Sequence, residues 1–171
     1  MKIIGEKSLS SNVIMGLNAI FAIISLIDIW VFSVILKVVV HISMNENIQS
    51  NVTDLVFFAT LLITGIIALL VIYQLIKIFK NLKKNILFCN DNLVSLKKIT
   101  IKCFILSVLY LALAIIVLII MKNATNEIVY YALAFSIILM LVFMVNGIGI
   151  KILCEIYKKA IEYKEENDFT I

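Results

Sequence analysis

The residue with the strongest claim to chemistry is Asp28, a carboxylate near the middle of an apolar run over about 13–40. Placing a carboxylate inside a bilayer is expensive, so such a residue usually faces other helices or water and often belongs to a proton or cation path. Asn18 and Ser25 share roughly its face of the expected helix, whereas Lys37 is nine residues away and about half a turn round. The partner of Asp28 must therefore come from another helix.

Further polar residues are expected at the depth of Asp28. Counting inward from the ends of the apolar runs places Thr60, Thr64, Tyr110 and Ser136 within about one helical turn, 5.4 Å, of its level. Two interpretations stay open: a proton or cation site, or a structural carboxyl group that is hydrogen-bonded within the bundle. In both cases the sequence predicts an intramembrane polar site made of Asp28, Asn18, Thr64 and Ser136.

The sequence contains no constellation typical of an enzyme. There is one histidine, His41, in a predicted loop where Glu46 is the only other type of metal ligand nearby. The chain also lacks a C-x-x-C pair, a G-x-S-x-G elbow and a P-loop, and its three cysteines show no paired spacing. We therefore expect no catalysis, no cofactor and no metal site.

Composition places the chain in a membrane. It is 63% hydrophobic with a mean hydropathy of +1.13, which is far more apolar surface than a soluble core of 171 residues buries. Four apolar runs, at about 13–40, 55–76, 99–121 and 128–152, are each long enough to cross a hydrocarbon core of about 30 Å. The prediction is an all-α, integral membrane four-helix bundle in lipid, formed by a single domain over residues 1–171.

The lysines predict the orientation of the bundle. Seven of them, with Asp91 as the one acid, fall within 77–102, around the loop expected at 77–98. Short loops rich in lysine stay on the cytoplasmic side, and four spans then bring both termini to that side too. This arrangement places 13 of the 15 lysines inside, since only Lys37 and Lys122 fall elsewhere. We expect a multi-pass protein of the cell membrane of a bacterium, since the absence of arginine and proline suits a low-GC genome.

Two helices are expected to continue into the cytoplasm as amphipathic extensions. The second should run past residue 76, with lysines on one side, until Asn90, Asp91 and Asn92 break it and cap the third. The tail over 153–171 carries Leu153, Ile156, Ala160 and Tyr163 on one stripe. We also expect this tail to dock against the loop around Phe88 and Asn92.

Two cytoplasmic motifs resemble a known family. Phe88-x-x-x-Asn92-Leu93-x-x-Leu96-Lys97-Lys98-Ile99 and the closing segment 165–171 look like those of a bacterial membrane family catalogued as domain of unknown function 2975. The resemblance covers nearly the whole chain, although Asn85 stands where the family commonly has glycine and Phe169 where leucine is usual. It implies four spans with both ends inside and no established activity. Members are often encoded beside a small helix-turn-helix regulator.

These observations predict a non-enzymatic, partner-binding membrane protein whose loop and tail bind a cytoplasmic regulator protein. The expected partner-binding residues are Phe88, Asn92, Leu96, Glu165, Glu166, Asn167, Asp168 and Phe169. No direct binding of nucleic acid is expected, because the lysines behind the net charge of +4 flank membrane spans. Two alternatives stay open: a small proton-coupled transporter that uses Asp28, acting as a homo-oligomer, and an immunity protein against a membrane-active peptide.

Overall fold

The chain folds into four long helices and contains no strand among the residues described. The computed structural model describes residues 9–44, 48–84, 86, 88–121 and 127–168, but not the side chains of 9, 48–53, 120–121, 127–129 and 168. The helices are α1 (Leu9–Ser43), α2 (Ile48–Lys83), α3 (Asn90–Met121) and α4 (Glu127–Asp168). Because the sequence has no proline, nothing removes a backbone donor from these long helices. The all-α prediction is confirmed.

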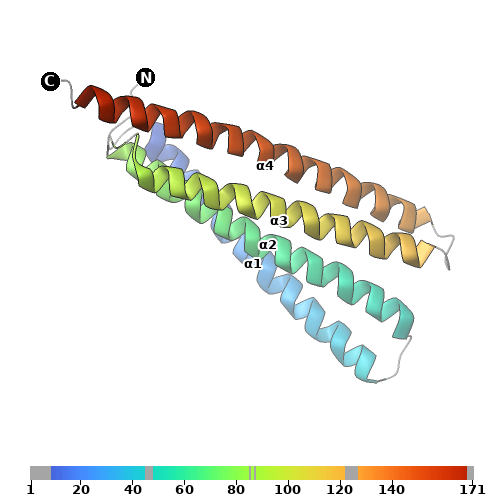
Figure 1. Ribbon diagram of the computed structural model, residues 1–171. Coiled ribbons are helices and arrows are strands. Elements are labelled where there is room, and N and C mark those ends of the chain that lie inside the picture. The colour runs from blue at the N-terminus through green and yellow to red at the C-terminus, as the bar shows by residue number, and fades with distance from the viewer. Residues whose placement is uncertain (1–8, 45–47, 85, 87, 122–126, 169–171) are drawn as a thin grey trace.

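Each helix packs against the next one along the chain (Figure 1). In the described part of the chain, α1 packs against α2 alone, and α3 lies between α2 and α4. The bundle is therefore open, with α1 and α4 at its two sides. Tyr110 of α3 contacts both neighbouring helices. Its hydroxyl lies 3.1 Å from the Thr64 hydroxyl on α2, and its ring stacks on the Phe143 ring of α4 with 5.7 Å between the ring centroids.

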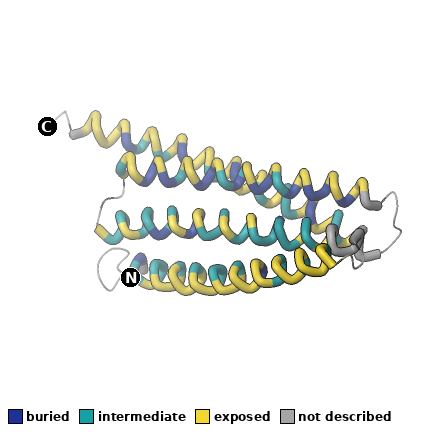
Figure 2. The backbone as a smooth tube through the Cα atoms, turned by 90° about the horizontal axis from the view of Figure 1, so that it is seen from below, coloured by how far each residue is buried: buried dark blue, intermediate teal, exposed yellow. Residues whose placement is uncertain are grey.

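All four helices are long and apolar enough to cross a membrane, over Ser10–Ser43, Asp54–Lys83, Asn90–Ile119 and Tyr130–Asn167. Exposed residues run along all four helices (Figure 2), and many of them are large aliphatic side chains. Such a surface would aggregate in water, whereas in a bilayer it faces lipid tails of similar polarity. The four-span prediction is confirmed, and the chain is a multi-pass membrane protein.

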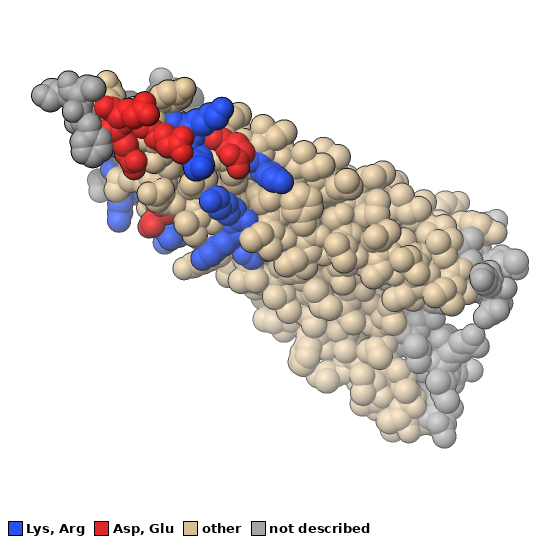
Figure 3. All heavy atoms as spheres, viewed as in Figure 1, with Lys and Arg blue, Asp and Glu red and all other residues tan. Residues whose placement is uncertain are grey.

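Charged side chains gather at one end of the bundle (Figure 3). We call this the lysine-rich end; it consists of 77–102 and 151–168, including the connection between α2 and α3. The helices continue into it, as predicted: α2 runs to Lys83, α3 begins as early as Asn90, and α4 extends past the beginning of α3 (Figure 1). The segment 77–98, expected to be a loop, is therefore mostly helix with a short connection.

Candidate functional site

The lysine-rich end is organised around the side chain of Asn92. The carbonyl of Cys89 accepts the backbone N–H groups of Asn92, at 3.2 Å, and Leu93, at 3.4 Å, and these bonds fix the first turn of α3. That turn directs the Asn92 amide inward, where it is only 1% exposed. A buried amide is expensive unless its polar atoms find partners, so its surroundings decide whether this end is ordered.

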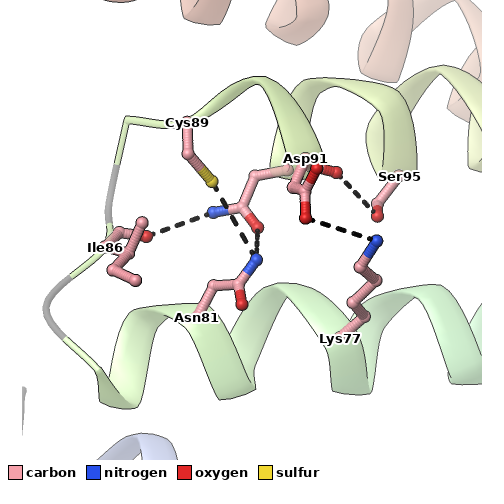
Figure 4. Close-up of polar contacts among 7 residues, drawn as sticks. Lys77, Asn81, Ile86, Cys89, Asp91 and Ser95 are labelled. Atoms are coloured by element: carbon pink, nitrogen blue, oxygen red, sulfur yellow. Dashed lines mark hydrogen bonds and ion pairs between the residues drawn. The ribbon is translucent and has the colours of Figure 1, made fainter.

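Asn92 finds its partners on three segments of the chain. Its Oδ1 accepts a 2.7 Å hydrogen bond from Asn81 Nδ2 on α2, and its Nδ2 lies 3.4 Å from the Ile86 carbonyl (Figure 4). The same Nδ2 donates to the hydroxyl of Tyr157 on α4, at 3.1 Å. We call Asn81, Asn92 and Tyr157 the asparagine junction. It joins three helices through neutral hydrogen bonds.

Apolar contacts surround the asparagine junction. Leu93, Cys154 and Ile161 form a buried cluster between α3 and α4, with Leu96 and Tyr157 packed against it. The Phe88 ring lies 5.5 Å from the Tyr157 ring, so the connection between α2 and α3 rests on α4. Tyr157 therefore uses its hydroxyl and its ring to hold this connection.

Ion pairs add little to this order. Lys77 Nζ lies 3.7 Å from Asp91 Oδ2, and Lys158 Nζ lies 3.6 Å from Glu162 Oε1, but all four side chains are well exposed. Exposed pairs of this kind contribute no more than about 1 kcal/mol. Asp91 also lies in the first turn of α3, where its negative charge interacts favourably with the helix dipole. The buried amide, rather than the charges, positions this end.

Asp28 occupies a notch on the neighbouring helix. Its carboxyl group lies directly over Gly65 of α2, so close that a methyl group on Gly65 would come within 2.6 Å of Oδ2. Oδ2 is buried and has no hydrogen-bond partner among the described residues. Because Thr64 directly precedes Gly65, Asp28 lies at the level of Thr64 and faces α2.

The other two members of the predicted polar site lie elsewhere. Asn18 is exposed, ten residues and about 15 Å along α1 from Asp28. Ser136 is buried, but its hydroxyl donates to the Ala132 carbonyl of its own helix at 2.8 Å. It lines an apolar cavity of about 80 Å³ between α2, α3 and α4. Of the four predicted residues, Asp28 and Thr64 thus lie at the same level of the α1–α2 interface. Asn18 lies further along α1, and Ser136 lies at the cavity between α2, α3 and α4.

A family model described as "Protein of unknown function (DUF2975)" matches residues 12–171. The chain belongs to this family. Comparison with curated proteins and with solved structures finds no match. The resemblance to this family, predicted from two short motifs, is therefore confirmed over residues 12–171.

In this DUF2975 protein, the first motif is largely used to build the bundle. Asn92 and Leu96, both predicted to bind a partner, are engaged in the asparagine junction and its apolar cluster. Phe88 packs on Tyr157 but keeps part of its ring exposed. The first motif thus leaves the Phe88 ring partly exposed, while Asn92 and Leu96 are used in packing α3 against its neighbours.

The second motif of the DUF2975 protein lies on the last turns of α4. Glu165, Glu166 and Asn167 are exposed. The side chain of Asp168 and the whole of Phe169 lie outside the described residues, so the expected docking through Phe169 is not described. The loop contact that is described runs to Tyr157, eight residues and about 12 Å before Glu165.

Three residues of these sites were absent from the predicted sets: Asn81, Tyr157 and Gly65. A signal existed for Tyr157, since it shares a helical face with Cys154 and Ile161 and is the one side chain there with a hydroxyl. Gly65 stands beside the Thr60–Thr64 stripe but on a different face, and nothing in its spacing points to Asp28.

Proposed function

We propose that this protein is a non-enzymatic membrane component whose lysine-rich end binds a cytoplasmic protein, such as a small helix-turn-helix regulator. One observation carries the proposal: α4, which extends past the beginning of α3 (Figure 1), exposes large apolar side chains along one stripe near its end. These are Leu153, Ile156 and Tyr163, which are 54%, 59% and 71% exposed.

The position of this stripe along α4 favours protein over lipid as its partner. The uncharged run of α4 ends at residue 150, and Ile156 and Tyr163 lie about 8 and 18 Å beyond Lys151. The stripe therefore extends beyond the hydrocarbon core, with Glu155 and Lys159 beside it. Exposed apolar residues rimmed by charges are typical of protein-binding surfaces.

The spacing of the stripe fits a helix that docks into a groove. Leu153, Ile156, Ala160 and Tyr163 stand at i, i+3, i+7 and i+10, the pattern by which an amphipathic helix presents one apolar face. The asparagine junction holds the beginning of this segment through Tyr157. A partner thus meets a helix that is already formed, which lowers the entropy lost on binding.

Replacing Tyr163 tests the proposal. In pull-downs from detergent-solubilised membranes, Tyr163→Ser should weaken recovery of the partner at least about 10-fold, because a large exposed aromatic is a typical interface hot spot. Tyr131→Ser is the matched control, since Tyr131 lies near the other end of the same helix and is 73% exposed. Deleting residues 165–171 measures the contribution of the acidic tail.

The pull-down also separates partner binding from transport. Asp28→Ala should retain the partner, whereas a transporter that uses Asp28 loses flux in the same variant. If Tyr163→Ser recovered the same partner protein as fully as the native chain does, the proposal would be contradicted.

The proposal requires the lysine-rich end to face the cytoplasm of the cell that makes the protein, and the distribution of the lysines supports this orientation. A reporter that is active only outside the cytoplasm, fused after Ile171, should therefore be silent. The same reporter inserted between α3 and α4 serves as the positive control. Strong activity of the fusion after Ile171 would reverse the orientation and remove the cytoplasmic partner from the proposal.

A further inference from the structure

A groove between α3 and α4 opens at the lysine-rich end. It has a volume of about 330 Å³, and its lining includes Lys97, Thr100 and Ile101 from α3 and Lys151 and Glu155 from α4. Ile101 and Phe104 also line a second hollow of about 350 Å³, which continues along α3 over Ile105 and Val108. The two hollows therefore form one groove with a polar mouth and an apolar stem.

The mouth of the groove is positively charged. Lys97 and Lys151 stand on different helices, and neither forms an ion pair within the part of the chain that is described. With Glu155 beside them, the three side chains sum to one positive charge. Two lysines that share a cleft without a carboxylate bound to either attract an anionic group.

The stem of the groove depends on a close approach of Phe104 to α4. Two atoms of the Phe104 ring lie 3.4 Å from where a Cβ of Gly147 would stand. The ring therefore rests against the backbone of α4, and the face of α3 at Ile101, Ile105 and Val108 stays open. All three of these side chains are exposed.

The groove lies at the depth where a phospholipid changes from headgroup to tail. The uncharged runs 103–121 and 128–150 mark the apolar band, and they measure about 28 and 35 Å against a hydrocarbon core of about 30 Å. Lys151 directly follows the second run, and Lys97 stands six residues, about 9 Å, before the first. Both lysines thus lie at the headgroup layer on one side of the apolar band, and the stem runs from there into the core.

We propose that this groove binds one anionic phospholipid. Its phosphate lies between Lys97 and Lys151, and one acyl chain follows Ile101, Phe104, Ile105 and Val108. The net positive charge at the mouth would bind the phosphate of such a lipid, and the apolar stem that continues from the mouth would hold its acyl chain. The site is distinct from the exposed stripe of α4 and does not depend on a protein partner or on the orientation in the membrane.

Lipid titration of the purified full-length protein in neutral detergent tests this proposal. The probe is phosphatidylglycerol, compared with phosphatidylcholine of the same acyl chains, and binding is read by native mass spectrometry. The native protein should bind phosphatidylglycerol at least about 10-fold more tightly. Lys97→Gln with Lys151→Gln should abolish this preference, whereas Lys98→Gln with Lys159→Gln should keep it. Both double variants remove one exposed lysine from each helix, so they have equal net charge.

A bulky residue in the stem tests the position of the acyl chain. Ile105→Trp should weaken phosphatidylglycerol binding at least about 5-fold by filling the stem, and Ile115→Trp should not, although Ile105 and Ile115 are equally exposed on α3. Circular dichroism checks that every variant keeps its helices. The proposal is overturned by equal losses in the two lysine variants, by unchanged binding in Ile105→Trp, or by the lack of any lipid preference. Displacement by inorganic phosphate or glycerol 1-phosphate at equal concentration would also overturn it, because the site would then bind phosphate alone.

Discussion

Asn92→Ala should lower the free energy of unfolding by about 2–4 kcal/mol. The substitution removes the acceptor of Asn81 and the donor to both Tyr157 and Ile86, and these bonds help to join α2, the connection and α4. Each half-buried group that loses its hydrogen bond to Asn92 keeps its desolvation penalty, so the loss exceeds that of an exposed hydrogen bond. Reversible unfolding in mixed detergent and sodium dodecyl sulfate micelles, followed by circular dichroism, measures the change.

Asn146→Ala is the matched control for this prediction. Asn146 is exposed on α4, and its amide donates to the Val142 carbonyl of its own helix at 2.8 Å. Its replacement should change the unfolding free energy by no more than about 0.5 kcal/mol. Combining Asn81→Ala with Asn92→Ala should cost less than the sum of the single losses, because the two amides bond to each other. Equal effects at Asn92 and Asn146, or strict additivity, would show that the junction does not hold the helices together.

Features that depend on composition and on neighbours along the chain were predictable. The positions of the spans are predicted by the apolar runs, and the position of the lysine-rich end is predicted by the lysines that flank those runs. The break before α3 also follows, because asparagine and aspartate favour turns and helix beginnings. In each case the physical cause lies within a few residues, so the sequence carries it directly.

Contacts between helices were less predictable, and the asparagine junction shows why. Asn92 was predicted to bind a partner because it is polar and lies in a motif, yet it is buried by Tyr157, which is 65 residues further along the chain. In a soluble helix an apolar stripe would mark the inward face, but helices that face lipid are apolar on every side. The sequence therefore does not indicate which face of α1 meets α2, or that Gly65 accepts the carboxyl group of Asp28.

Gly65→Ala should destabilise the bundle by about 1–3 kcal/mol, although the same change elsewhere in a helix is favourable. The new methyl group would overlap the Asp28 carboxyl group, so α1 must separate from α2 or the carboxyl group must leave its notch. Gly149→Ala is the control, because nothing lies within 4 Å of its would-be Cβ. That variant should be neutral or up to about 1 kcal/mol more stable, because alanine favours the helix.

The decisive measurement is Gly65→Ala in a chain that already carries Asp28→Ala. Once the carboxyl group is gone, the methyl group has room, and the substitution should change from destabilising to neutral or stabilising, with a coupling of about 2 kcal/mol between the two positions. If Gly65→Ala destabilised α2 for a reason unrelated to Asp28, the stability loss would be the same with and without Asp28→Ala. A reversal of sign therefore assigns the effect to one contact: the Asp28 carboxyl group lies in the Gly65 notch and sets how closely α1 approaches α2.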